Sequence, residues 1–481
     1  MATPIPRNRA SFTVAEILAA TGGRLVARGA ESVGSISTDT RAIDPGACFV
    51  ALRGEVHDGH AHLAAARERG AALAIVEREV EGPSGLAIVR VEDTLVALGD
   101  LARAHRRRWC PPDVRRPVIA ITGSAGKTTT RIAVTAVMAA SVDDPEAVHA
   151  SQGNLNNRVG LPMVLLGLEP KHVMAVVEMG MNRPGEIAEL CRIAEPDLGI
   201  VTLIAAAHTE GMGSIEAVAE EKGALFRALP AHGIAIGNAD DPLVRAQMDR
   251  SPARRRLLYG RAADADMRIV RREPIGMHAS RVQVQGVEFT TTLLGEAGAL
   301  ACAAALTVER ALGGGGCQRA LEHVEAGAGA GRLMPRVLPG DVAVIDDTYN
   351  ANPASMCASI RAAAEIARAT GRRLLLVLGE MRELGTLSAS GHDEVGQAAA
   401  ASGAAQVFAV GSGDAPRMAA RAVEGGAQAS HAERVEDVAA LVRLAVRPGD
   451  LVLVKGSRSV GAERVVAELA KGRGAGPGGD S

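Results

Sequence analysis

Short runs of apolar residues alternate along the chain with longer segments in which apolar residues recur at a helical period. Runs of this length predict buried strands, and the longer repeats predict amphipathic helices. This alternation is typical of mainly parallel sheets, so we predict an α/β fold throughout. The strand candidates are residues 48–52, 72–77, 86–91, 118–122, 173–180, 198–204 and 233–240, and four further strands, each leading into a loop, lie within 342–353, 373–385, 405–411 and 450–459.

Breaks in this pattern divide the chain into three domains. The 481 residues suffice for about three domains at roughly 150 residues each. A helix predicted over 94–108 ends before two prolines, and the glycine-rich segment 325–332 precedes the last group of strands. We therefore predict domains at 1–93, 94–334 and 335–470, followed by a disordered tail at 471–481.

Composition and charge narrow the classes of function. The net charge is −2, with 53 basic and 55 acidic residues, so neither nucleic acid nor an anionic membrane is an expected partner. We interpret the basic run 103–116 as a solvated helix end and a linker. Six cysteines without a C-x-x-C pair argue against a zinc site or a disulfide framework. With no apolar run of signal-peptide or membrane-span length, we expect a soluble, cytoplasmic protein.

The segment VIAITGSAGKTTTR, residues 118–131, runs from an apolar strand through glycines into a lysine and three threonines. In such loops, backbone N–H groups and a helix N-terminus surround phosphates, the lysine reaches the outer ones, and the hydroxyl holds Mg²⁺. The usual first glycine is absent, because Ile121 stands five residues before Gly126. The loop is therefore a variant, but its order of strand, glycines, Lys-Thr pair and helix predicts a phosphate site.

Three side chains further along the central domain could turn a phosphate site into an active site. Glu178 ends a predicted strand, from where a carboxylate could reach a bound Mg²⁺. His208 follows another apolar run, and from this position alone a structural role is the more common one. Lys222 lies in a helical pattern that by itself predicts a solvated polar face.

Seven segments occur in the order found in Mur ligases, and the chain resembles that family over about residues 12–470. They are SQGNLNNRVGLP, VVEMGMNRPGEI, AAAHTEGMGSIEAVAEEKGALF, GNADDP, VIDDTYNANP, LVLGEMRELG and LVKGSRS. The segment STDTRAIDPGACFVALRGEVHDGHAHLAAARERGA is similar to the family's domain for the UDP-sugar end. Mur ligases carry a shorter G-x-x-G-K-[ST] loop, which matches Gly123 to Thr128 and accounts for the missing glycine.

The resemblance implies an ATP-dependent ligase built from a UDP-sugar-binding domain, a central P-loop domain and a Rossmann-like third domain. The details are most similar to the members that join D-alanyl-D-alanine to UDP-N-acetylmuramoyl-tripeptide through an acyl phosphate, giving a pentapeptide for peptidoglycan. Sibling ligases with another amine acceptor, a P-loop switch or motor, and a non-catalytic nucleotide-binding module are the alternatives. A monomer is expected, and the pattern fits a tripeptide ending in diaminopimelate or in lysine.

The resemblance also implies roles for individual residues. Contacts to ATP are implied for Gly123, Ser124, Ala125, Gly126, Lys127, Thr128, Thr129, Asn154, Arg332 and Asp347. Mg²⁺ ligands are implied at Thr128, Glu178, His208 and Lys222, the last as a carbamate, and Lys127, Glu178, His208 and Lys222 are the implied catalytic set. Contacts to the UDP-sugar are implied for Ser37, Thr38, Asp39, Thr40 and Arg41, and contacts to the dipeptide for Asn350 and Asn352.

One segment departs from the family pattern. Mur ligases usually carry a G-x-H-N-x-x-N run that helps to hold adenine, whereas this chain has GEAGALACAAAL, with Ala297, Gly298 and Ala301 at the positions of the histidine and the two asparagines. We keep ATP as the expected nucleotide and leave adenine recognition unassigned. An inactive homologue is the other interpretation, but the phosphate, metal and third-domain motifs are intact.

Overall fold

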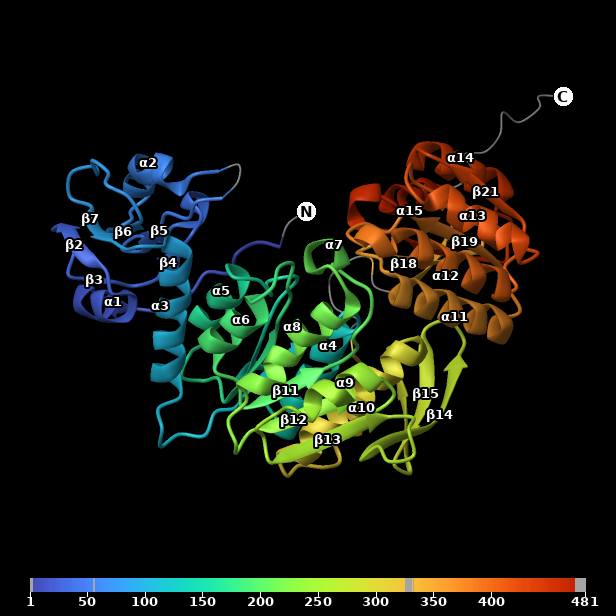
Figure 1. The fold of residues 1–481 in the computed structure, drawn as a ribbon, viewed down its shortest axis with the longest axis horizontal. Helices are drawn as coiled ribbons and strands as arrows, with labels where there is room; N and C mark the ends of the chain where they lie inside the picture. The colour runs from blue at the N-terminus through green and yellow to red at the C-terminus, as the bar shows by residue number, and fades with distance from the viewer. Residues whose placement is uncertain (1–2, 55–56, 325–330, 332, 472–481) are drawn as a thin grey trace.

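The computed structural model describes residues 3–54, 57–324, 331 and 333–471. Figure 1 shows three lobes in chain order: an N-terminal lobe in blue, a central lobe from cyan to yellow, and a C-terminal lobe in orange and red. One large sheet lies in each lobe, with five, nine and six strands respectively. The predicted α/β class is confirmed, and each of the three predicted domains contains one of these sheets.

The N-terminal sheet has the strand order β2-β7-β6-β5-β4, with β4 to β7 parallel and β2 antiparallel to β7. Its strands are β2 (Arg24–Ala27), β4 (Ile36–Ser37), β5 (Cys48–Val50), β6 (Leu73–Val76) and β7 (Ala87–Arg90). A separate pair is formed by β1 (Phe12–Thr13) and β3 (Ser32–Val33), and the helices are α1 (Val14–Thr21) and α2 (Leu63–Glu68). The short β4 ends at the turn that carries the predicted UDP-sugar residues.

The central sheet has the order β16-β15-β14-β13-β12-β11-β8-β10-β9, and the strands from β9 to β14 are parallel. These parallel strands are β8 (Val118–Thr122), β9 (Val148–Ala150), β10 (Met174–Glu178), β11 (Leu198–Val201), β12 (Ile234–Asn238), β13 (Arg255–Gly260) and β14 (Met267–Ile275). Since β8 lies between β10 and β11, the loops after these three strands meet at one edge of the sheet.

Helices cover both faces of the parallel part of the central sheet. Along β8, Val118 and Ala120 belong to one hydrophobic cluster and Ile119 and Ile121 to another, as alternating side chains require. The first cluster includes α5 (Gly160–Leu166), α6 (Glu186–Ala194), α8 (Ile215–Ala228) and α9 (Pro242–Met248); the second includes α4 (Lys127–Ser141) and α10 (Gly295–Ala311). The short α7 (Thr209–Met212) lies at the same edge as the phosphate loop.

The C-terminal sheet has the order β17-β18-β22-β19-β20-β21, with β17 antiparallel and the other strands parallel. Its strands are β17 (Met334–Leu338), β18 (Val342–Asp347), β19 (Arg373–Gly379), β20 (Gln406–Val410), β21 (Ala429–Ala432) and β22 (Asp450–Lys455). One face is covered by α11 (Pro353–Thr370), α12 (Ser388–Ala401) and α13 (Ala415–Glu424), the other by α14 (Val435–Ala445) and α15 (Glu463–Ala470).

Helix α3 (Thr94–Trp109) joins the N-terminal and central lobes (Figure 1). Its Leu98 and Leu101 lie in one hydrophobic cluster with Ile75 of the N-terminal sheet and Val177 of the central sheet. The two lobes therefore share a continuous core through this helix.

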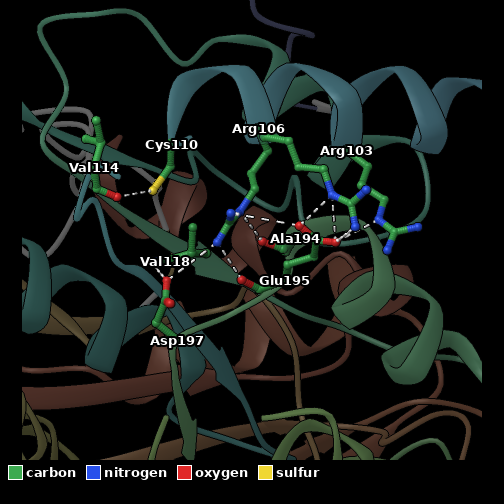
Figure 2. Close-up of polar contacts among 9 residues, drawn as sticks. Arg103, Arg106, Cys110, Val114, Val118, Ala194, Glu195 and Asp197 are labelled. Atoms are coloured by element: carbon green, nitrogen blue, oxygen red, sulfur yellow. Dashed lines mark hydrogen bonds and ion pairs between the residues drawn. The ribbon is translucent and has the colours of Figure 1, made fainter. Parts of the chain in front are cut away.

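We interpreted the basic run at the end of α3 as a solvated helix end, but several of its arginines contact the central lobe. Figure 2 shows α3 arginines reaching the end of α6: Arg106 is 9% exposed and donates hydrogen bonds to the carbonyl oxygens of Ala194 (3.0 Å) and Glu195 (2.8 Å). Arg103 and Arg107 form ion pairs with the Glu195 carboxylate. These contacts satisfy the last carbonyl groups of α6 and fasten α3 to the central lobe.

All the predicted strands are present, but an antiparallel extension of the central sheet was missed. It consists of β14, β15 (Ala279–Val284) and β16 (Val287–Thr291), which pair antiparallel. Buried and exposed positions alternate along β15, so these strands lack the continuous apolar runs by which the others were identified. Of the predicted boundary segment 325–332 only Gly331 is described, and the predicted tail from 472 onward lies outside the described residues.

Candidate active site

The phosphate loop connects β8 to α4 through two glycines with positive φ angles. Gly126 has a φ of 82° and caps the N-terminus of α4. A Cβ atom on Gly123 would lie 1.9 Å from Thr202 Oγ1, so no larger residue fits there. Thr202 Oγ1 in turn donates to the carbonyl of Ala125 (2.6 Å), and Lys127 Nζ donates to the carbonyl of Gly123 (2.7 Å). The loop is thus held in a fixed shape in front of a helix N-terminus, where anions bind.

Glu178 lies at the end of β10, beside the first turn of α4. It is 2% exposed, and its two carboxylate oxygens accept hydrogen bonds from Thr128 Oγ1 (2.8 Å) and from Asn156 Nδ2 (2.9 Å). The guanidinium of Arg131 lies 3.7 Å from the same carboxylate. The structure therefore brings together Thr128 and Glu178, two of the predicted metal ligands.

His208 caps the N-terminus of α7 with a φ of 58°. Its Nδ1 lies 2.6 Å from Glu383 Oε2, which comes from the loop after β19 in the C-terminal domain. Burial lowers the pKa of His208, the positive charges of Lys127 and Lys222 lower it further, and Glu383 opposes them. The charges of two predicted catalytic lysines therefore favour the neutral form of the His208 imidazole.

Lys222 is buried, although the helical pattern alone placed it on a polar face. Its residue is 1% exposed, and burial lowers the pKa of its amine well below the usual range; the charge of Lys127 acts in the same direction and Glu221 opposes it. The neighbouring Glu221 accepts the backbone N–H groups of Gly185 and Ile187 and so serves the N-terminus of α6. Burial therefore shifts this amine toward its neutral form relative to a lysine in water.

The donors at this edge suit a hard cation only in combination with a phosphate-bearing ligand. They are the carboxylate of Glu178, the hydroxyl of Thr128 and the imidazole of His208, and among the described residues no group of three His, Cys, Asp or Glu side chains could hold a metal ion alone. Mg²⁺ is commonly bound by one or two carboxylates together with phosphate oxygens and water. The residues present fit that type of site.

Asp347 ends β18 in the C-terminal domain and is fixed by three donors. They are Lys455 Nζ (2.7 Å), Ser359 Oγ (2.6 Å) and the backbone N–H of Leu333 (3.2 Å). Lys455 Nζ also donates to the carbonyl of Asn350 (2.9 Å). The buried Lys455 therefore ties the end of β22 to the loop after β18.

Asn352 connects this loop to the phosphate loop. Its Oδ1 accepts the N–H of Ser355 and caps α11, while its Nδ2 donates to the carbonyl of Ser124 (3.1 Å). A second contact between the two domains joins Thr209 Oγ1 to the carbonyl of Leu384 (2.8 Å). The loops after β18 and β19 therefore both face the phosphate loop and α7.

The predicted UDP-sugar residues form a compact turn after β4. Asp39 accepts hydrogen bonds from the Arg41 guanidinium, which lowers the pKa of Asp39. Ser37 Oγ donates to the carbonyl of Asp39, Thr40 lies in the same short helical turn, and Thr38 Oγ1 is buried without a hydrogen-bond partner among the described residues. A buried, unpaired hydroxyl at a turn is a polar group to which a ligand could bind.

The other predicted residues do not all converge on the phosphate loop. Asn154 is exposed and accepts a hydrogen bond from Thr3 Oγ1 (2.6 Å), so the N-terminal segment of the chain lies over its loop. Thr129 lies in the first turn of α4. Arg332 lies outside the described residues.

The segment that departs from the family pattern forms the start of α10. A Cβ atom on Gly298 would lie 2.4 Å from the carbonyl oxygen of Leu293, so an asparagine does not fit there without a backbone shift. Gly295 approaches Ala362 of α11 closely, and Glu296 forms ion pairs with Arg261 and Arg272. The first turn of α10 is thus packed against the C-terminal domain, with no room for the usual side chain at 298.

Among the residues of this region that were not predicted from the sequence are Asn156, Glu383 and Lys455. Asn156 and Glu383 lie within two motifs that the sequence analysis recognised, SQGNLNNRVGLP and LVLGEMRELG. The other polar residues of these motifs were therefore the signal from which both could have been identified. Lys455 is the polar residue at the end of an apolar strand, as Glu178 and Asp347 are. The position at the end of a strand would therefore have identified Lys455 as well.

Three family models match the chain. They are the Mur ligase family catalytic domain over residues 32–106, the Mur ligase middle domain over 121–308, and the Mur ligase glutamate ligase domain over 331–458. Together they span all three lobes.

Relatives match over almost the full length. The chain is 34% identical over 475 residues to the UDP-N-acetylmuramoyl-tripeptide–D-alanyl-D-alanine ligase of Escherichia coli (strain K12), covering 95% of this chain and 98% of that protein. It is 34% identical over 478 residues to the enzyme of the same name from Treponema pallidum (strain Nichols), covering 95% and 99%.

Solved structures agree with these relatives. A crystal structure of MurF from Acinetobacter baumannii has a TM-score of 0.85 and 28% identity, covering 98% of this chain and all of that one. MurF ligase from Thermotoga maritima in complex with ADP has a TM-score of 0.78 and 28% identity, covering 91% and 97%. By sequence and by structure, the chain belongs to the Mur ligase family and is a MurF-like member of it.

Proposed function

We propose that this protein joins D-alanyl-D-alanine to UDP-N-acetylmuramoyl-tripeptide at the expense of ATP, giving UDP-N-acetylmuramoyl-pentapeptide for peptidoglycan synthesis. The observation that carries the proposal is the convergence of the phosphate loop with Glu178, His208 and Lys222 at one sheet edge. The loops of the C-terminal domain face this edge. The names of the close relatives supply the two substrates.

The chemistry explains why ATP is needed. A carboxylate is a poor electrophile, because its negative charge repels nucleophiles and oxide is a very poor leaving group. Attack of the tripeptide carboxylate on the γ-phosphorus forms a C–O–P bond and releases ADP. The dipeptide amine then attacks the acyl carbon, loses a proton, and displaces inorganic phosphate. One amide bond forms for each ATP cleaved to ADP and phosphate.

The phosphate loop and Lys127 would hold the β- and γ-phosphates, because the loop offers backbone N–H groups at the start of α4 and Lys127 adds a positive charge. Thr128, Glu178 and His208 would hold Mg²⁺, which when bound neutralises charge between the phosphate and the substrate carboxylate. The Glu178 carboxylate is already oriented for this by its hydrogen bonds with Thr128 and Asn156. Positioning and charge neutralisation thus provide most of the catalysis.

Lys222 would act as a carbamate. A neutral amine is the form that reacts with CO₂, and burial together with the charge of Lys127 favours that form. The product is an anionic oxygen ligand, whereas an ammonium group at this place would repel a cation. The carbamate would add a second anionic donor to a set in which the Glu178 carboxylate is the one acidic group and in which the described residues offer no group of three His, Cys, Asp or Glu side chains.

The dipeptide would approach from the C-terminal domain. Its loops after β18 and β19 carry Asn350, Asn352 and the GEMRELG segment, and Asn352 reaches the phosphate loop directly. Asp347 would contact ATP from the same side. The UDP end would bind at the turn from Ser37 to Arg41, where Thr38 offers an unpaired hydroxyl.

All six cysteines are free thiols, which together with ATP as a substrate supports action in the cytoplasm. We expect the protein to act as a monomer.

The proposal is tested by measuring phosphate release. We expect release only when UDP-tripeptide and D-alanyl-D-alanine are both present, and not with single amino acids, because the acyl phosphate persists until the correct amine arrives. Release with glutamate or another single amino acid would indicate a sibling ligase. Rapid ATP hydrolysis by the protein alone would indicate a switch or motor instead.

Lys127→Ala should lower turnover by about 10²–10³-fold while leaving the protein folded, because Lys127 would contact the nucleotide and is not part of the hydrophobic core. The matched control is Lys171→Ala, which removes an exposed lysine paired with Glu146 and should keep full activity. If Lys127→Ala formed product at the wild-type rate, the phosphate loop would not take part in catalysis as proposed.

A further inference from the structure

The contact between His208 and Glu383 is part of a larger docking interaction between the central and C-terminal domains. The two side chains meet at 2.6 Å although they are 175 residues apart. The backbone N–H of Glu210 donates to the carbonyl of Glu383 (3.1 Å), and Thr209 Oγ1 donates to the carbonyl of Leu384. A Cβ atom on Gly385 would lie 3.1 Å from Glu210 Cα, so the two backbones approach closely.

Both partners are held in an uncommon backbone conformation. His208 and Glu383 have φ angles of 58° and 64°, in the left-handed region that non-glycine residues rarely adopt. The backbone hydrogen bond from Glu210 to Glu383 holds the two turns side by side, which brings the two side chains within reach of each other. The Glu383 side chain itself is 59% exposed and contributes little to packing.

The geometry has a chemical consequence for the imidazole ring. A carboxylate oxygen accepts hydrogen bonds, so Nδ1 of His208 carries the proton toward Glu383. In the neutral ring, Nε2 is then the nitrogen with the free electron pair. A carboxylate behind a histidine in this way fixes the tautomer and the orientation of metal-binding imidazoles.

We propose that Glu383 is a positioning residue, through which the C-terminal domain orients His208 for metal binding in the central domain. The inference rests on the proposed function, in which His208 is a metal ligand. It adds that the central domain alone does not complete the cation site. Docking of the loop after β19 onto α7 is what presents Nε2 of His208 in the correct direction.

A plain interdomain ion pair makes a different prediction. It would affect only how tightly the two domains associate, and any acidic residue at this interface would contribute in a similar way. Glu210 provides the comparison, because it is an exposed acid in the same interface, and no hydrogen bond or ion pair of its side chain is found within the described part of the chain.

The test compares full-length wild-type protein with Glu383→Ala, Glu383→Gln and the control Glu210→Ala. Each is titrated with Mn²⁺ in the presence of a non-hydrolysable ATP analogue and the UDP-tripeptide. Electron paramagnetic resonance measures Mn²⁺ affinity, and its pulsed form detects coupling between Mn²⁺ and an imidazole nitrogen. The Mg²⁺ concentration for half-maximal activity is measured in parallel.

For Glu383→Ala we expect a roughly 10–100-fold loss of Mn²⁺ affinity at one site, a weaker nitrogen coupling, and a higher Mg²⁺ requirement. Glu383→Gln should recover part of the affinity, because its amide oxygen still accepts from Nδ1. Glu210→Ala should match wild type in all three measurements.

The outcomes separate the two hypotheses. If wild type shows no nitrogen coupling, His208 is not a metal ligand and that part of the proposed function fails. If wild type shows the coupling and Glu383→Ala keeps both the coupling and the affinity, only the present inference fails. An equal loss in Glu210→Ala would also overturn it in favour of general domain association.

Discussion

Lys222 differs in its chemistry from the exposed lysines of the protein because almost no water reaches its amine. At 1% exposure the charged form is disfavoured, and the nearby Lys127 disfavours it further. The same residue on the surface of α8 would be an ordinary cation. At the scale of single residues, the surroundings therefore decide whether this side chain repels a metal or can be converted into a ligand for one.

We predict that Lys222→Ala loses most activity, by about 10²-fold or more, while still binding ATP. Acetate or formate should partly restore turnover by supplying oxygen donors in the vacated space. Lys222→Arg should not be rescued, because its cation remains. Steady-state phosphate release with and without added carboxylate tests this, and full activity of Lys222→Ala without any additive would return Lys222 to a structural role.

The start of α10 provides a prediction about stability. Gly298→Asn restores the residue usual in Mur ligases, but its Cβ atom would meet the carbonyl of Leu293 at 2.4 Å. We expect a loss of about 1–3 kcal/mol in stability and no gain in ATP affinity. Ala297→His is the matched control, because it restores the neighbouring family residue at a position that is only partly buried. Thermal unfolding and nucleotide titration distinguish the outcomes; a more stable, tighter-binding Gly298→Asn would show that α10 adapts.

At the scale of elements, three histidines support the segment between α5 and β10. His105 and His149 approach the carbonyl groups of Leu168 and Val164 at 2.8 and 2.7 Å. His172 Nδ1 accepts the N–H of Glu169, and its ring lies 4.7 Å from that of His149. Burial lowers the pKa of all three, that of His172 to about 4.

This cluster predicts a loss of stability in mild acid. Because the folded-state pKa of His172 lies below the unfolded value of about 6.5, the unfolded chain binds more protons between pH 6.5 and pH 4. Stability should therefore be fully present above pH 6.5 and fall as the pH drops through this window. His172→Asn keeps an acceptor for Glu169 and should flatten the dependence of melting temperature on pH. An unchanged pH dependence would exclude His172 as a source.

Strands and their ends were predictable from the sequence to different degrees. Buried parallel strands such as β8, β10 and β18 are apolar up to their C-terminal ends, and the polar residues at those ends mark the active edge. The hairpin strands β15 and β16 alternate with polar residues and gave no such signal. Contacts between domains, such as that of Glu383 with His208, depend on how two lobes dock, and spacing along the chain carries no information about that.

At the scale of the whole molecule, the central and C-terminal domains contact each other in two regions. In the first, Asn352 hydrogen-bonds to Ser124 and Glu383 contacts His208. In the second, Arg272 of β14 forms an ion pair with Glu365 of α11. The proposed ATP contacts are divided between these domains, so the site is complete only when they are docked. Binding of nucleotide and UDP-substrate should therefore favour the compact form.

Asn352→Asp tests this coupling. The carboxylate still caps α11, but it loses the amide donor to Ser124 and places a negative charge beside the phosphate loop. We expect a roughly tenfold higher KM for ATP and a larger radius of gyration with saturating ligands than in wild type. Solution scattering and kinetics measure the two effects. Wild-type scattering that does not change on ligand binding would indicate a rigid site and exclude this mechanism.

The shared core around α3 has a consequence for which substrates can react. Because this helix joins the N-terminal and central lobes through one hydrophobic cluster, we expect the turn at 37–41 and the phosphate loop to keep a nearly constant separation. The distance between these two sites would then select substrates by their length. A substrate bound by its nucleotide end places its terminal carboxylate at the phosphate loop only if the peptide between them is long enough. We therefore expect a substrate whose peptide is one residue shorter to bind without reacting, because its carboxylate does not reach the phosphate loop.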